Sequence, residues 1–273
     1  MLRTVSRYES IATERITMKQ AFGMAVPQTL EDVCDRSKLA LVVYDMQVGI
    51  VSQLKGAEAV TMQVARVVEA SRNAGLRVFF TRHMSLPKEL MGAFQYRMAM
   101  AWQRIDDPAK VEPWFLRDSP GFAILPELAP RPSEAIFDKL AMSAFEGTPL
   151  AFALRDCGIT AVAIAGIAME IGIEPTARHA ADLGIIPVVI EDACGAGHVD
   201  AAQRSCEALH FAGDAIMTDT EAFCAALGKA SGAWAKQKMS DESDSARLDQ
   251  TLSVSSSCCS DFGRPGSCPP RTD

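Results

Sequence analysis

The stretch TAVAIAGIAMEIGIEPTARHAADLGIIPVVIEDACG, residues 160–195, decides the fold. It contains two short apolar runs, at residues 160–166 and 186–193, with a helical pattern between them that stops at Gly184. Apolar runs of this length, separated by a helix, are typical of parallel strands buried on both faces. The stretch therefore predicts one strand–helix–strand unit of an α/β protein.

The same alternation continues outward in both directions. Before this unit, three strands are predicted at residues 39–45 (LALVVYD), 77–83 (RVFFTRH) and 135–139 (AIFDK), and a sixth strand follows it at residues 215–219 (AIMTD). Further helices are predicted at residues 56–74, 148–158, 199–211 and 221–227, the second with Thr148 as its N-cap and Pro149 in its first turn. This order predicts a three-layer α/β/α fold around a six-stranded, mainly parallel, Rossmann-like sheet.

The chain of 273 residues has room for one large α/β domain with terminal segments. We assign residues 1–36 to an N-terminal extension, residues 37–235 to the domain, and residues 240–273 to a serine-rich tail that we expect to be disordered. Residues 84–132 form a long excursion between two strands, rich in Met and aromatic residues. We expect it to pack over a pocket or against another subunit, and packing within the core of one chain is the alternative.

The overall charge excludes some classes of partner. A net charge of −7 and an isoelectric point near 5.2 argue against nucleic-acid binding and against docking on an anionic membrane. No apolar run approaches the roughly 20 residues that span a bilayer. Eight scattered cysteines, with neither a secretory signal nor a C-x-x-C pair, predict reduced thiols in a cytoplasmic protein.

Polar residues follow the predicted strands where a ligand is expected. Parallel sheets bind ligands outside the carboxyl ends of their strands, and these ends carry Asp45, Arg82 with His83, and Lys139. An aspartate and a lysine at neighbouring strand ends suit proton transfer, because the cation favours the anion or the two share a proton. A structural ion pair at the sheet edge is the alternative reading.

Three segments, in this order, resemble the isochorismatase-like hydrolases, also called the cysteine hydrolase superfamily. They are LALVVYDMQVGIV, DKLAMSAFEGTPLAFALRDCGI and AIAGIAMEIGIEPTARHAADLGIIPVVIEDACG, and the resemblance extends over residues 39–223. It implies a catalytic aspartate at Asp45 and a catalytic lysine at Lys139. It also places Gly172 where most members carry the nucleophilic cysteine, so the chain resembles the subgroup that has glycine there.

The glycine changes the chemistry that the resemblance implies. Without a thiolate no thioester forms. The isochorismatases of siderophore and phenazine pathways also have glycine at this place, and they hydrolyse a vinyl ether with an aspartate as the acid and water as the attacking group. We therefore expect a cofactor-independent hydrolase of a small, anionic metabolite that uses Asp45 and Lys139. A water-dependent amidohydrolase and a non-catalytic metabolite-binding relative are the two alternatives.

The chain also departs from the isochorismatases. Ala141 stands where they have arginine, and His83 replaces a glutamine, so isochorismate itself is not the expected substrate. Three arginines are candidates for holding a carboxylate instead, with surface positions as the alternative for each: Arg82, Arg97 and Arg104. A nicotinamidase-like metal site needs more than His83, so no metal is expected.

The remaining expectations concern the pocket and its neighbours. We expect six residues to bind substrate: His83, Arg82, Ile167, Ala168, Glu170 and Ile171. Glu170 would orient water, or simply be an acid favoured at a helix N-terminus. The resemblance implies a cis peptide between Ile167 and Ala168. Cys194 is expected to be a packed thiol, with a surrogate nucleophile as the alternative, and His179 a helix-surface or interface residue. The family is commonly oligomeric, which implies a dimer or tetramer.

Overall fold

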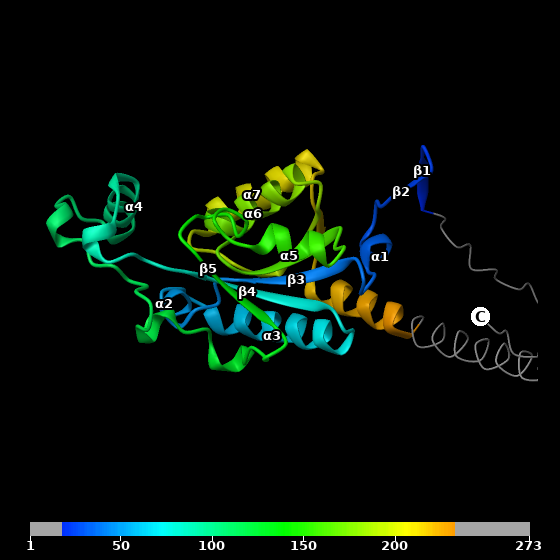
Figure 1. Cartoon of the computed structure of the whole chain (residues 1–273), viewed down its shortest axis with the longest axis horizontal. Coiled ribbons are helices and arrows are strands. Elements are labelled where there is room, and N and C mark those ends of the chain that lie inside the picture. The colour runs from blue at the N-terminus through cyan, green and yellow to red at the C-terminus, as the bar shows by residue number, and fades with distance from the viewer. Residues whose placement is uncertain (1–17, 233–273) are drawn as a thin grey trace, which may run out of the picture. The chain divides into compact units, whose positions relative to one another are not determined.

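A single parallel sheet organises the part of the chain that the computed structural model describes, residues 18–232 (Figure 1). Its strand order is β5-β4-β3-β6-β7-β8, and all five neighbouring pairs are parallel. The strands are β3 (Leu39–Tyr44), β4 (Arg77–His83), β5 (Ala135–Lys139), β6 (Ala161–Ile167), β7 (Ile186–Gly195) and β8 (Ile216–Thr218). The predicted six-stranded α/β fold is confirmed, with no antiparallel strand in this sheet.

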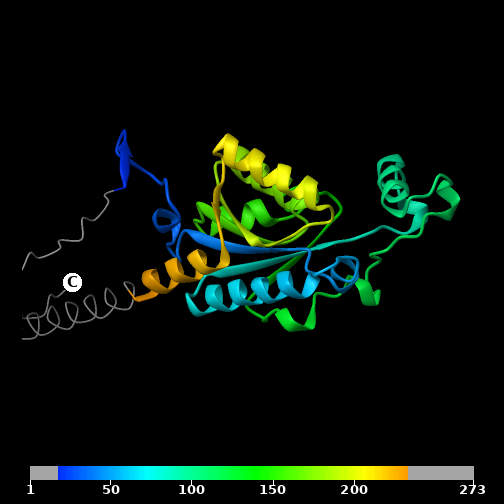
Figure 2. The same ribbon diagram turned by 180° about the vertical axis from the view of Figure 1, so that it is seen from behind.

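Helices cover both faces of the sheet and complete three layers (Figure 2). One face carries α3 (Ala57–Asn73) and a helix that begins at residue 220. The other face carries α5 (Leu150–Asp156), α6 (Glu174–Asp182) and α7 (Val199–Ala212). The helices that cover the sheet bury an apolar stripe against the strands, as in α3, where Val64, Val67 and Val68 are buried.

The boundaries of several elements differ from the sequence prediction. β4 and β5 match it, whereas β7 continues two residues further, to Gly195, and β8 is shorter at both ends. The helix α5 begins at Leu150 with Pro149 at the N-cap, so the prediction that Thr148 is the N-cap was wrong. The Thr148 hydroxyl nevertheless accepts the backbone N–H of Leu150 at 3.2 Å, a bond of the kind that an N-cap threonine makes.

The N-terminal extension contains short elements that the sequence did not predict. They are an antiparallel hairpin of β1 (Lys19–Ala21) and β2 (Met24–Val26), followed by α1 (Leu30–Val33). Elements of three or four residues are too short to show a hydrophobic period. The predicted tail, residues 240–273, lies outside the described residues.

The chain divides after Gly228 into two units, and the whole sheet lies within the first. Between residues 18 and 232, no helix combines the length and the apolar character needed to cross a membrane.

The excursion between β4 and β5 holds a helix, α4 (Ala93–Gln103), and several 3-10 turns. No residue of α4 is buried, so this helix does not pack into the core. It lies beyond the carboxyl ends of the strands, the same edge to which the short helix α2 (Val48–Val51) belongs (Figure 1).

The direction of chain growth reverses between β3 and β6. From β3 the chain adds β4 and β5 on one side, then returns to add β6, β7 and β8 on the other. A crevice opens at such a switch point, outside the carboxyl ends of the two strands. Here those ends are Tyr44–Asp45 and Gly166–Ile167, and Tyr44 pairs in register with Gly166. The topology therefore places the site next to Asp45.

Gly166 has to be a glycine at this crossing of strands. Its φ is +137°, and a Cβ there would lie 2.0 Å from the Tyr44 carbonyl oxygen. A side chain would meet both backbone strain and a backbone atom that cannot move aside.

We expect Gly166→Ala to lower the free energy of unfolding by about 3 kcal/mol, measured by urea denaturation. Gly228→Ala is the matched control, because its added Cβ meets no atom within 4 Å, and it should change stability by less than about 1 kcal/mol. Equal effects of the two substitutions would contradict the close approach of β3 and β6.

Candidate active site

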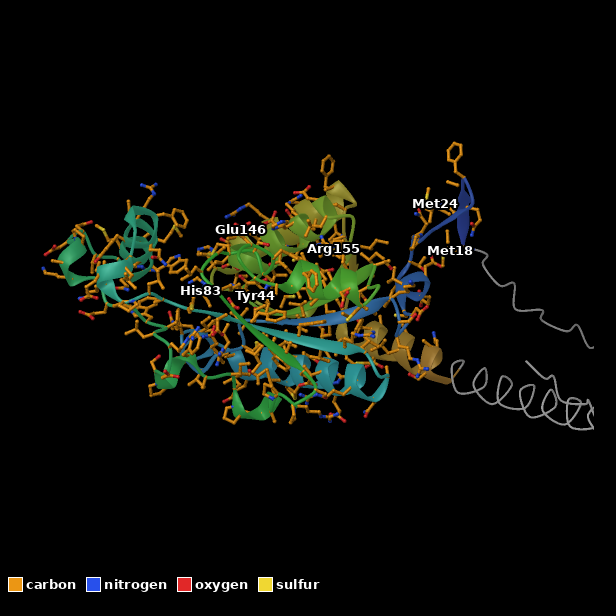
Figure 3. The ribbon with its side chains drawn as sticks, viewed as in Figure 1. Met18, Met24, Tyr44, His83, Glu146 and Arg155 are labelled. Atoms are coloured by element: carbon orange, nitrogen blue, oxygen red, sulfur yellow. The ribbon has the colours of Figure 1, made fainter. Side chains whose placement is uncertain are left out.

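A cavity of about 410 Å³ opens at the switch point between β3 and β6. Its walls come from the ends of β3, β4 and β6, from α2 and the loop after it, from the loop before α7, and from α4 with the segment that follows it. Its lining residues include Tyr44, Asp45, His83, Trp102, Arg104, Trp114, Phe115, Ile167, Ala168, Ile171 and Gly197. Figure 3 labels Tyr44 and His83 at the end of the sheet that faces α4.

Asp45 and Lys139 form a buried ion pair at this edge. Lys139 Nζ lies 2.7 Å from Asp45 Oδ2, and both side chains are almost wholly buried. The two residues come from β3 and β5, with β4 between them, so the prediction that their strands are neighbours was wrong. The long side chain of lysine is needed to reach across. Asp45 lines the cavity, whereas Lys139 is not one of its lining residues. The ion pair that the sequence predicted is therefore present, and one of its two members lines the cavity.

The carboxylate of Asp45 is held from a second direction. Thr81 Oγ1 donates to Asp45 Oδ1 at 2.6 Å and accepts the backbone N–H of Asp45 at 3.2 Å. The backbone of Asp45 has a φ of +47°, an unusual value for a residue other than glycine. Such a conformation persists only where the surrounding contacts determine it, which is common at functional sites.

The ammonium of Lys139 has three acceptors in the apolar interior. They are Asp45 Oδ2, Tyr44 Oη at 2.8 Å and the Ala141 carbonyl at 3.2 Å. Burial lowers the pKa of Lys139 below its usual value, and the Asp45 carboxylate opposes that shift. The pair therefore gives up its shared proton more readily than an exposed lysine would, which suits a proton-transfer role.

His83 lines the cavity as a neutral imidazole. Burial, together with the charge of Lys139, lowers the pKa of His83 to about 4, although Asp45 acts in the other direction. The rings of Trp102 and Phe115 lie edge-on to it, each with its centroid 6.0 Å away. Gln47 fixes the backbone of His83 by accepting its N–H at 2.6 Å and donating to its carbonyl at 3.0 Å. His83 is thus a rigid, uncharged hydrogen-bonding group.

Of the three candidate arginines, Arg104 lines the cavity. It closes α4 in a left-handed conformation, and its guanidinium has no partner among residues 18–232. Arg97, about two turns earlier on α4, is outside this cavity. Arg82 does not reach the cavity either. It pairs with Asp138 at 2.7 Å and stacks on Phe122, because it points to the opposite face of β4 from Thr81 and His83.

The turn after β6 contributes both predicted and unpredicted features. Ile167, Ala168 and Ile171 line the cavity, and the peptide between Ile167 and Ala168 is cis, as expected. Met169–Ile173 winds as a π-helical turn ahead of α6, where the sequence predicted one continuous helix. Glu170 is not one of the residues that line the cavity, and its Oε1 accepts the backbone N–H of His198 at 2.6 Å. That bond ties the turn to the loop before α7.

Two further side chains lie apart from Asp45. Cys194 is on β7, where its sulfur contacts the Ile164 carbonyl at 3.8 Å and burial raises its pKa, so it is a packed thiol. His179, on α6, shares a hydrogen bond with Ser143 at 2.9 Å and contacts the ring of Phe145. Among residues 18–232, no three His, Cys, Asp or Glu side chains gather in a way that would hold a metal ion.

Three residues of the site were not found from the sequence. Thr81 could have been found, because it lies two residues before His83 and so faces the same side of β4. Gln47 is wholly buried, and although it belongs to the D-x-Q motif that contributes to the family resemblance, no role was predicted for it. Tyr44 looked like the last apolar residue of a buried strand, and its hydroxyl contacts depend on residues far away in the chain.

The chain is similar in sequence to known proteins of one family. The isochorismatase domain model matches residues 39–222. The isochorismatase family protein YecD of Escherichia coli O157:H7 is 33% identical over 168 residues, in an alignment that covers 59% of this chain and 81% of YecD. The ureidoacrylate amidohydrolase RutB of Variovorax paradoxus is 26% identical over 172 residues, which cover 58% of this chain and 68% of RutB.

A solved structure of an isochorismatase family protein has a similar fold. An isochorismatase family protein from Burkholderia thailandensis superposes with a TM-score of 0.58 at 28% identity, covering 70% of this chain and 96% of that structure. The chain is a hydrolase with a three-layer α/β/α fold and an aspartate–lysine pair at the switch point. The chain belongs to the isochorismatase family.

We expect His83 to make the protein less stable in mild acid. The folded state binds the His83 proton only near pH 4, whereas the unfolded chain binds it near pH 6.5, so this contribution to stability is complete above pH 6.5 and is lost on acidification toward pH 4. The loss should be roughly 1–3 kcal/mol in urea titrations across this range.

His83→Gln should flatten that part of the stability profile. His198→Gln, which removes an exposed imidazole, is the matched control and should leave the profile as steep as in the wild type. A wild-type profile that is already flat between pH 6.5 and 4 would contradict the burial of a neutral His83.

Proposed function

We propose that this hydrolase belongs to the subgroup without a nucleophilic cysteine and cleaves a small anionic metabolite by acid–base chemistry, with vinyl-ether hydrolysis as the leading reaction. One observation carries the proposal: Asp45 lines the cavity, and its carboxylate is bonded to the buried Lys139. Gly172 supplies no nucleophilic atom, and no cysteine lines the cavity among the described residues. Water is then the attacking group.

Asp45, Lys139 and one water molecule account for every proton that moves in this reaction. The pair's shared proton passes from Lys139 to Asp45, and Asp45 delivers it to the terminal carbon of the enol ether. The carbon bonded to oxygen becomes electrophilic, and water adds to it. The proton that this water loses returns to the Asp45 carboxylate. The resulting hemiketal then breaks into a carbonyl compound and an alcohol, so no covalent enzyme intermediate is needed.

The walls of the cavity support a small substrate with an anionic group. Asp45 and Lys139 cancel each other's charge, and His83 is neutral above about pH 4. Arg104 is then the charge without a counterpart among the described lining residues. A guanidinium binds a carboxylate through two parallel hydrogen bonds. Trp102, Trp114 and Phe115 would contact the apolar part of the same molecule.

Water-dependent hydrolysis of an amide is the second candidate reaction. Its support is the similarity to the ureidoacrylate amidohydrolase RutB. In this reaction Asp45 would take the proton from the attacking water and pass it to the leaving nitrogen. The third candidate is a relative that binds a metabolite without turning it over.

We also propose that the protein is located in the cytoplasm and that it forms a homo-oligomer. The support for the oligomer is the apolar surface of the excursion, where the side chains of Leu90 and Phe94 are about two-thirds exposed. Size-exclusion chromatography with light scattering measures it directly.

The reaction is tested by assaying the wild type and Asp45→Asn on isochorismate, on simpler enol ethers and on a panel of small amides. We expect turnover of an enol ether, and a loss of about 100-fold or more in kcat in the variant, because an amide cannot carry the transferred proton. Asp138→Asn is the control, since Asp138 pairs with Arg82 outside the cavity.

The alternative outcomes separate the candidates. Amide turnover without enol-ether turnover would replace the leading reaction by the second candidate. Thermal stabilisation by a panel compound without turnover of any compound would favour a binding protein.

The role of Arg104 is tested by Arg104→Gln. We expect KM for the panel substrate, or the ligand concentration that stabilises the protein, to rise about 10- to 100-fold, with kcat nearly unchanged. Arg97→Gln removes a charge from the same helix outside the cavity and should have little effect. An equal response to the two substitutions would mean that Arg104 acts only through the general field of the protein.

A further inference from the structure

The side chain of Tyr44 occupies the space that any side chain at position 172 would need. A Cβ built on Gly172 would lie 1.9 Å from Tyr44 Oη, 2.2 Å from Cζ and 2.5 Å from Cε1. Both residues are buried, and Tyr44 packs in the core cluster between the sheet and α5–α6. A side chain at position 172 therefore requires the ring to leave its packed position, so positions 44 and 172 are sterically coupled.

The hydroxyl of Tyr44 is bonded on two sides. It accepts a hydrogen bond from Lys139 Nζ at 2.8 Å and donates one to the Met142 carbonyl. The ammonium also lies 4.3 Å from the centre of the Tyr44 ring, within the range of a cation–π contact. These contacts fix Lys139 beside Asp45, and Tyr44 itself borders the cavity.

We propose that Tyr44 is the positioning residue of this site: its ring fills the place of a side chain at position 172, and its hydroxyl holds Lys139 against Asp45. The pair Tyr44–Gly172 leaves no room for a thiol at position 172 while the ring stays in place, so water is the attacking group. The steric part stands on geometry alone, whereas the attack by water and the orienting of Lys139 for catalysis rest on the proposed function.

The steric part is tested by a cycle of Gly172→Cys, Tyr44→Val and the double variant. Gly172→Cys alone should lower the melting temperature strongly, and adding Tyr44→Val should restore much of the loss. In the double variant the new thiol lies next to Lys139, which favours its thiolate. Labelling of this introduced thiol by iodoacetamide at pH 7, followed by peptide mass spectrometry, should be at least about tenfold faster than in Gly172→Cys alone.

Two control variants and one substitute variant complete this set of substitutions. Tyr44→Phe combined with Gly172→Cys should remain unstable, because the ring atoms Cζ and Cε1 stay in place. Ala101→Cys puts a thiol on the α4 wall of the cavity, away from Lys139, and should label more slowly than the thiol at position 172 of the double variant. Tyr44→Leu replaces Tyr44→Val if valine does not support folding. Equal stability and equal labelling at position 172, with and without the Tyr44 ring, would overturn the proposal.

The positioning part is tested by the pH profile of Tyr44→Phe. The groups that face Lys139 are Asp45, Tyr44 and His83, and removing the Tyr44 hydroxyl takes one acceptor from the ammonium. The pKa of Lys139 should fall further, so the alkaline limb of kcat/KM should move to lower pH by about one unit.

Tyr96→Phe is the matched control, because its hydroxyl also bonds a carbonyl, that of Lys88, far along the chain from Lys139. Its alkaline limb should stay in place. An unmoved limb in Tyr44→Phe would refute the positioning role. If no panel compound is turned over, the thiol cycle still decides the steric part, and the failure then falls on the proposed function.

Discussion

The buried ion pair of Asp45 and Lys139 is the interaction on which the site depends. Removing two charges from water costs several kcal/mol for each ion, and their attraction offsets this only when further hydrogen bonds satisfy both groups. Here Thr81, Tyr44 and the Ala141 carbonyl supply those bonds. Because β4 separates the two partners, the pair also requires the strand order around it to be correct. Fold and chemistry are therefore specified together at this edge of the sheet.

Much of the fold followed from local patterns. The apolar runs of β3 to β8 and the helix stop at Gly184 are short-range signals, and the parallel sheet follows from their alternation with helices. The signals failed where tertiary context decides. Examples are the π-helical turn at Met169–Ile173 and the helix α4, which carries no clear apolar stripe and is not buried. Short elements such as the β1–β2 hairpin contain too few residues to show a period.

The residues of the site also fall into two groups, those that the sequence predicts and those that it does not. Asp45, His83 and Lys139 could be predicted, because the carboxyl ends of parallel strands meet at one edge whatever the details of packing. Arg82 could have been excluded, because it is next to His83 on β4 and therefore points to the opposite face of the sheet. The role of Tyr44 was not visible, because a tyrosine that ends a buried strand ordinarily fills core volume. Only the three-dimensional approach of Gly172 to its ring, from more than a hundred residues away in the chain, reveals the other use of that side chain.

The helix α4 has a consequence for how this protein diversifies. It supplies Ala101, Trp102 and Arg104 to the cavity wall while burying none of its own residues. Substitutions on it alter what the cavity accepts at little cost to the rest of the molecule, since no core packing is disturbed. Selection can therefore retune ligand preference through one peripheral segment while the proton-transfer apparatus on the sheet stays the same. Recognition and reactivity are, in this chain, separately mutable properties.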